Sequence, residues 1–92
     1  MTPPFECPAP AELRAIREWL GLSQSEFAEE LGFRENGADV VRGWEIGERF
    51  GKPFSPTPLA WRAIRYMVLA VSLSRLEIGP ATLRDALPER LR

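Results

Sequence analysis

Arginine and lysine side chains supply most of the binding chemistry that this chain can offer. Histidine is absent, and Cys7 is the single cysteine. These two facts exclude serine–histidine and cysteine–histidine nucleophiles and every metal site with histidine ligands. Cys7 together with acidic side chains could still bind a metal weakly, but we expect no metal, no cofactor and no catalytic residue. Guanidinium and ammonium groups instead bind phosphates, and the guanidinium fork also fits paired acceptors.

Charge is unevenly distributed along the chain. Residues 1–31 hold two arginines and six glutamates, whereas residues 32–92 hold ten basic and seven acidic side chains. The net charge of −1 argues mildly against a nucleic-acid partner, because affinity for DNA comes largely from neutralising phosphates. The basic excess after residue 31 still allows one locally positive face.

Length and composition indicate one domain with a modest core. The 92 residues are 45% hydrophobic and 27% charged, as in an ordinary globular chain. The start of the chain lacks a signal-peptide pattern, and the longest apolar run, residues 66–71, is far too short for a membrane span. We therefore expect a cytoplasmic protein without a membrane partner, and a single cysteine fits a reducing compartment.

Proline, glycine and capping residues divide the chain into an arm and five helices. Residues 1–10 hold four of the nine prolines and are predicted to be an extended arm, so the domain spans residues 11–92. Pro10 fits the first position of the first helix, which Gly21 ends. Ser23 and Glu26 form a capping-box pattern for the second helix, which ends at Gly32.

The remaining helices are delimited in the same way. Asn36 is predicted to cap a third helix that ends at Gly47, and residues 48–54 are predicted to be a loop. Ser55 is predicted to cap the longest helix, with Pro56 at its first position and its end near Ser74. A short last helix is expected over roughly residues 81–87. The expected fold is therefore all-α, with five helices.

Four residues fit two helices that cross tightly. Ala28 supplies a small residue at the crossing, and Gly32 supplies the turn glycine four residues later. Val41 and Trp44 then supply a β-branched and a large apolar residue for the inner face of the second helix. This order is typical of a helix-turn-helix.

The span from Glu12 to Gly47 resembles the Cro/C1-type (XRE-like) helix-turn-helix family of phage and bacterial regulators. The matching segments are residues 13–17, 20–24, 27–32 and 44–47. The turn between the two helices, residues 33–38, is three residues longer than usual in that family. The resemblance implies a compact five-helix bundle of the lambda-repressor-like type and a DNA-binding transcription regulator.

The resemblance also implies roles for individual residues. Gln24 would contact a phosphate, with a plain helix-start role as the alternative, and Arg17 would pair with Glu45 to link two helices. The first turn of the third helix and the residue before Trp44 would meet base edges, and Arg42 is the best candidate for guanine or phosphate. Arg34, Arg49 and Lys52 flank that helix as phosphate clamps or as ordinary solvated charges. The full set of candidate DNA-binding residues is Gln24, Arg34, Asn36, Ala38, Asp39, Arg42, Gly43, Arg49 and Lys52.

Apolar residues cover more than one side of the longest helix. From residue 66 onward this helix is apolar all round, which indicates burial on several sides. A second copy of the chain is expected to bury this surface, through Tyr66, Met67, Leu69, Ala70, Leu73 and Leu76.

The expected function is a dimeric repressor or autoregulator that binds an inverted-repeat operator in double-stranded DNA. The alternative is an antitoxin-like interaction module whose longest helix or C-terminal segment binds a partner protein such as a toxin. Trp19, Trp44 and Trp61 are expected to pack in the core.

Overall fold

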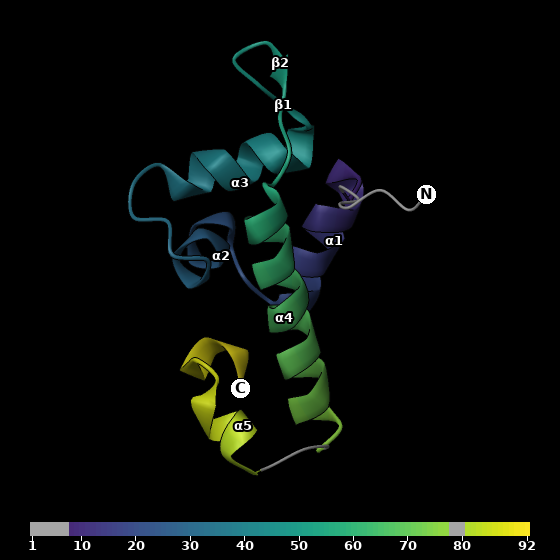
Figure 1. The fold of residues 1–92 in the computed structure, drawn as a ribbon. Helices are drawn as coiled ribbons and strands as arrows, with labels where there is room; N and C mark the ends of the chain where they lie inside the picture. Colours follow the sequence, from purple (N-terminus) through teal and green to yellow (C-terminus); the bar gives the residue numbers. More distant parts are fainter. Residues whose placement is uncertain (1–7, 78–80) are drawn as a thin grey trace.

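The computed structural model describes residues 8–77 and 81–92, which form five α-helices, a two-stranded hairpin and a short 3-10 turn (Figure 1). The predicted arm therefore lies outside the described residues except for its last three. The elements are α1 (Pro10–Leu20), α2 (Gln24–Glu30), α3 (Gly37–Ile46), β1 (Glu48–Arg49), β2 (Lys52–Pro53), α4 (Pro58–Arg75), α5 (Ala81–Ala86) and η1 (Glu89–Leu91).

Local signals fix the first two helices as expected. Pro10 opens α1, and Gly21 ends it in the left-handed conformation at φ 76°. Ser23 caps α2, because its hydroxyl accepts from the Glu26 N–H while the Glu26 carboxylate accepts from the Ser23 N–H. The predicted capping box is therefore confirmed.

The start of α3 differs from the prediction. Asn36 is the N-cap residue, but its backbone is left-handed at φ 53° and its side chain makes no capping hydrogen bond. A capping side chain normally reaches the first turn from an extended backbone, which this conformation does not provide. Asn36 serves instead as a turn residue that tolerates a positive φ.

Residues 48–54 form a hairpin rather than the predicted loop. Glu48 pairs with Pro53 and Arg49 with Lys52 in antiparallel register. The Phe54 N–H then donates to the Gly47 carbonyl at 3.0 Å, which ties the end of the hairpin to the end of α3. In Figure 1 the hairpin stands above the rest of the molecule as the link between α3 and α4.

The longest helix begins two residues later than predicted. Thr57 caps α4 with its hydroxyl, and Pro58 takes the first position. A start at Pro56 would force Thr57 into helical backbone directly before a proline, which is sterically disfavoured. Pro56 is instead a buried core residue.

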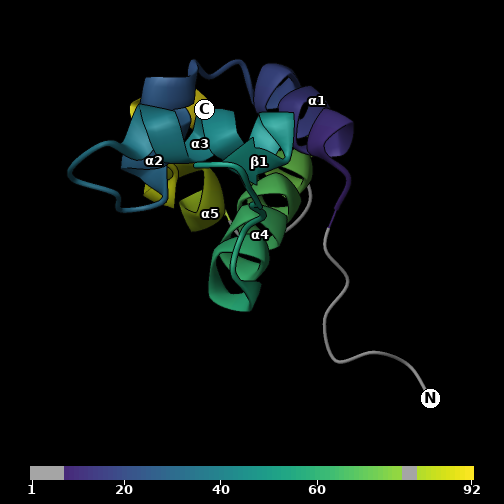
Figure 2. The same ribbon diagram turned by 90° about the horizontal axis from the view of Figure 1, so that it is seen from above.

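The core lies between α4 and the layer formed by α1, α2 and α3. Seen from above in Figure 2, α1 and α2 lie toward opposite ends of α3, and α4 lies beside this layer. α5 and η1 follow α4 back toward α2, and their Leu87 and Leu91 complete the core. The buried hydrophobic residues are Leu13, Leu20, Leu22, Phe27, Ala28, Val41, Trp44, Ile64, Val71, Leu87 and Leu91.

One of the three tryptophans departs from the prediction. Trp44 is buried and Trp61 is half-buried against the core, but Trp19 is 45% exposed. The Arg75 guanidinium lies 4.3 Å from the centre of the Trp19 ring and covers it at the end of α4. Trp19 therefore holds α1 to α4 through a surface cation–π contact instead of core packing.

Candidate nucleic-acid interface

α2 and α3 form a two-helix unit that is held by a very close backbone approach. A Cβ atom added at Gly37 would lie 2.6 Å from the Ala28 Cβ and 3.0 Å from the Phe33 Cβ. Ala28 is therefore the small residue at the crossing, as predicted, and its partner there is Gly37, which the sequence did not single out. Gly32 has a φ of 88°, in keeping with its predicted place in the turn. At the other end of the turn of residues 33–38, the Phe33 ring meets the Trp44 ring edge-on, with 5.7 Å between the ring centroids. These contacts at Gly37 and Phe33 hold the turn at both of its ends.

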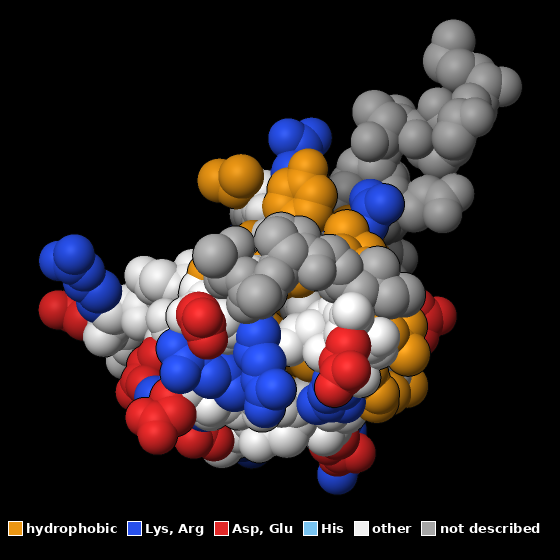
Figure 3. Space-filling view, turned by 90° about the horizontal axis from the view of Figure 1, so that it is seen from below, with side chains coloured by type: hydrophobic (Ala, Val, Ile, Leu, Met, Phe, Trp, Pro, Cys, Tyr) orange, Lys and Arg blue, Asp and Glu red, His pale blue; other side chains and the backbone are white. Residues whose placement is uncertain are grey.

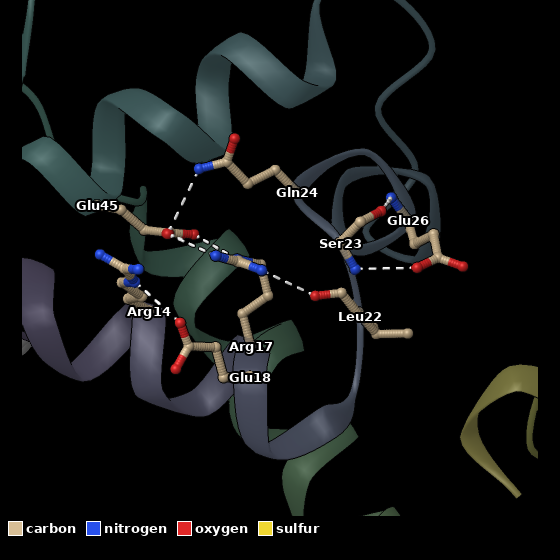
Figure 4. A network of polar contacts seen from close by, with 8 residues as sticks. All are labelled: Arg14, Arg17, Glu18, Leu22, Ser23, Gln24, Glu26 and Glu45. Atoms are coloured by element: carbon tan, nitrogen blue, oxygen red, sulfur yellow. Dashed lines mark hydrogen bonds and ion pairs between the residues drawn. The ribbon is translucent and has the colours of Figure 1, made fainter.

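A bidentate ion pair locks α1 to the last turn of α3 (Figure 4). Arg17 Nε donates to Glu45 Oε2 at 2.7 Å, and Arg17 Nη2 donates to Glu45 Oε1 at 3.0 Å. Arg17 Nη1 also donates to the Leu22 carbonyl at 2.9 Å. The two side chains are 13% and 7% exposed. The hydrogen bond to Glu45 raises the pKa of Arg17 above its ordinary value. The contact that the resemblance implied is thus present in the structure.

Gln24 lies beside this ion pair at the start of α2. Its amide Nε2 is 3.5 Å from Glu45 Oε1, so the side chain turns toward the pair as Figure 4 shows. The neighbouring Glu26 carboxylate bonds to Ser23, and these hydrogen bonds lower the pKa of Glu26. A phosphate at this helix start would therefore meet the amide of Gln24 together with a nearby negative charge.

The outward face of α3 carries Asp39, Arg42 and Ile46, which are all exposed. These positions are three and four residues apart and thus lie on one side of the helix. Val41 and Trp44 lie on the other side, buried against the core. α3 therefore presents one polar and partly apolar strip to solvent.

A shallow groove separates this strip of α3 from the hairpin. Asp39, Arg42 and Ile46 line the α3 side, and Glu48, Arg49 and Phe50 line the hairpin side. The groove thus brings four candidate residues together, namely Asp39, Arg42, Gly43 and Arg49. Its charged groups are two guanidinium groups and the carboxylates of Asp39 and Glu48. A groove beside an exposed helix, with arginine forks on both walls, can hold an anionic polymer.

Gly43 lines the same groove, but it is buried rather than exposed on α3. A Cβ atom there would lie 2.9 Å from Phe54 Cδ2 and 3.5 Å from the Arg49 Cβ. The absence of a side chain at residue 43 lets the hairpin pack against α3. Gly43 therefore serves the packing of the hairpin on α3.

The other candidate residues are spread over two further places. Arg34, Asn36, Ala38 and Asp39 line a hollow between α2 and the start of α3. Lys52 is exposed on β2. A separate apolar groove between α1 and α4 holds none of the candidate DNA-binding residues.

The end of the molecule that carries the C-terminal segment has mixed charge. Figure 3 shows basic and acidic side chains interspersed on this face. Arg90 there pairs with Glu29 at 3.2 Å and with Glu30 at 3.5 Å. Within residues 8–77 and 81–92, no three acidic, histidine or cysteine side chains gather where they could hold a metal ion.

Sequence reasoning missed Phe50, which lies at the tip of the hairpin and lines the α3 groove. Phe50-Gly51 lacks the Asn-Gly or Asp-Gly pair that signals a tight hairpin turn. The exposed Ile46 was missed as well, although its position four residues after Arg42 could have revealed it.

Comparisons of the chain with protein-family models, with curated proteins and with solved structures gave no match. None of the helices in the described part of the chain is long and apolar enough to cross a membrane.

Proposed function

We propose that the chain is a sequence-specific DNA-binding regulator that inserts α3 into the major groove. The observation that carries this proposal is the exposed strip of α3 on a rigid two-helix unit, with arginines on both walls of the adjoining groove. An α-helix fits the major groove of B-DNA, where base edges are distinguishable. The proposed fold type is that of the lambda-repressor-like helix-turn-helix proteins, in keeping with the Cro/C1-type resemblance.

Arg42 is the proposed base-reading residue. Its side chain is exposed on the α3 strip and makes no ion pair among those observed in the described residues. A free guanidinium can donate to both guanine O6 and N7. Phosphate contacts would come from Arg34, Arg49 and Lys52. Such contacts position the protein and add affinity, but they do not distinguish one base sequence from another.

The proposed active form is a homodimer that reads an inverted repeat. Tyr66 and Leu69 on α4 are 64% and 54% exposed, and Leu76 directly after α4 is 67% exposed, a large apolar exposure for a small helical chain. Met67, Ala70 and Leu73 lie partly buried beside them. A two-fold pair would place its two α3 helices about one DNA turn apart. The proposed setting is the cytoplasm, and the proposed action is repression or autoregulation.

The same apolar surface of α4 favours a second candidate function. An antitoxin-like module would cover that surface with a partner protein such as a toxin. This function and DNA binding can occur in one molecule, because they would use two different helices, α4 and α3. A chain that aggregates when expressed alone and is soluble only with a co-expressed partner would favour the second candidate.

Selection of bound duplexes from a random DNA library tests the main proposal. Wild type should enrich an inverted repeat, and Arg42→Ala should fail to enrich it. Arg84→Ala is the matched control, because Arg84 is an exposed arginine on α5 and should leave selection unchanged. Binding should also weaken steeply with salt, since each phosphate contact releases counterions. Absence of any enrichment at low salt would exclude a sequence-reading function.

A further inference from the structure

The tip of the hairpin places an aromatic side chain where folding gives no reason for one. Phe50 and Gly51 form the two-residue turn, with φ of 54° and 73°. Phe50 is 87% exposed, the highest value among the large hydrophobic side chains of the described residues. Exposure of this ring to water gains no burial energy for the folded chain.

The backbone at Phe50 makes this choice of residue more costly. A two-residue hairpin turn with positive φ at both positions favours Asn-Gly or Asp-Gly. A phenylalanine with left-handed backbone is a strained exception. Strain together with exposure indicates that the ring serves contact with another molecule.

The two cations at the tip favour an anionic partner, although Asp39 and Glu48 also line the adjoining groove. Arg49 and Lys52 flank the turn, and the four tip residues 49–52 include no acid. The Arg49 guanidinium carbon lies 5.0 Å from the centre of the Phe50 ring and 5.4 Å from that of Phe54. The two rings hold this cation, while its N–H groups can still donate to an anion such as phosphate.

The hairpin is held in a fixed place beside α3. The Phe54 ring packs over Gly43, and the Phe54 N–H bonds to the Gly47 carbonyl. Phe50 and Arg49 therefore line the same groove as Arg42 on α3. A duplex bound along the α3 strip would pass directly beside the tip.

We propose that the β1–β2 hairpin is a second DNA-contacting element, which rests on the DNA-binding function proposed above. Its Phe50 ring packs against sugar and base edges of the minor groove that adjoins the major groove occupied by α3. Apolar side chains at such positions are used by minor-groove binders to contact base steps. Arg49 and Lys52 bind phosphates on the two sides of that groove, where they add affinity and fix the register.

Phe50→Asn separates a role in DNA contact from a role in folding. Asparagine suits left-handed backbone, so the melting temperature of this variant should not fall below that of wild type. Its affinity for the selected duplex, measured by fluorescence anisotropy, should fall roughly tenfold. In hydroxyl-radical footprints of the duplex bound to Phe50→Asn, the nucleotides contacted by α3 should stay protected. The nucleotides on either side of them should lose the protection that wild type gives.

Trp19→Ala is the control for removal of an exposed aromatic. The Trp19 ring lies against Arg75, which is the last residue of α4 and is far from the hairpin in sequence. The Trp19→Ala variant should therefore keep the affinity and the footprint of wild type. Unchanged affinity and footprint for Phe50→Asn, with Arg42→Ala inactive, would overturn the hairpin proposal and leave the DNA-binding function standing. If Phe50→Asn binds DNA as tightly as wild type but no longer self-associates, the Phe50 ring contacts protein instead of DNA. That result would also overturn the hairpin proposal. Failure of wild type to bind any duplex would overturn both proposals.

Discussion

Arg17 joins α1, the turn after it and α3 through one guanidinium group. Its partners are the Glu45 carboxylate and the Leu22 carbonyl, and the ion pair is largely removed from water. Loss of one member of such a pair leaves an uncompensated charge in a poorly solvated place. The orientation of α3 relative to α1 therefore depends on both residues.

Arg17→Met should destabilise the protein by about 3–5 kcal/mol, because the Glu45 carboxylate loses both of its charged hydrogen bonds. Urea denaturation followed by circular dichroism measures the loss. The double variant Arg17→Met/Glu45→Leu should recover a large part of it, since no charge is then stranded. Single-variant losses of only a few tenths of a kcal/mol would show that the pair contributes little.

Glu26 should make the stability of α2 depend on acid pH. Its folded pKa lies below the ordinary value of 4.5, chiefly because the Ser23 N–H donates to its carboxylate. A depressed folded pKa gives a contribution that is complete above about pH 5 and is lost as the pH falls through the folded pKa. The melting temperature of wild type should therefore fall more between pH 5 and roughly pH 3 than that of Glu26→Gln. Parallel curves for the two proteins would contradict the prediction.

At the scale of elements, the crossing of α2 and α3 depends on Gly37. The Ala28 methyl occupies the space that a side chain at residue 37 would need. The two helices can approach this closely only while one of the two residues has no side chain. The position of the exposed α3 strip follows from that contact.

Gly37→Ala should destabilise the protein by about 1–3 kcal/mol, because the added methyl overlaps the Ala28 Cβ. The double variant Gly37→Ala/Ala28→Gly moves the methyl from one helix to the other and should be more stable than the sum of the two single effects. Thermal or urea unfolding of the three variants tests this. Additive losses would show that the close contact is not what limits the crossing.

Local signals predicted most helix boundaries but not the contacts between elements. Gly21, Gly47 and the Ser23–Glu26 box act within a few residues, so their roles can be inferred from the sequence alone. The choice of Gly37 as the contact glycine depends on how two helices meet in space. The hairpin was missed because Phe50-Gly51 is an unfavourable turn sequence, and its stability comes from packing of Phe54 over Gly43. The α3 groove, built from both elements, could not be foreseen for the same reason.

The described part of the molecule leaves one side of α4 without apolar cover. Tyr66, Leu69 and Leu76 are exposed although neighbouring positions on the helix pack into the core. Such a row along a helix and its C-cap residue is a typical contact for a second copy of the chain.

A dimer should therefore form at tens of micromolar, as light scattering coupled to gel filtration would show. Leu69→Glu should give a monomer with unchanged helical content, because it places a charge in the proposed contact at a position that is 54% exposed. Glu77→Gln, an exposed substitution just after α4, is the control and should leave the dimer intact. A monomeric wild type at these concentrations would contradict the prediction.

The three tryptophans provide separate optical probes of three junctions. Trp44 is buried where α2 and α3 meet, Trp61 is half-buried in the groove between α1 and α4, and Trp19 is exposed beneath Arg75. Iodide should quench the emission of Trp19 strongly and that of Trp44 hardly at all. Single-tryptophan variants would thus report, by the wavelength and quenching of their emission, which junction opens first as the protein is heated.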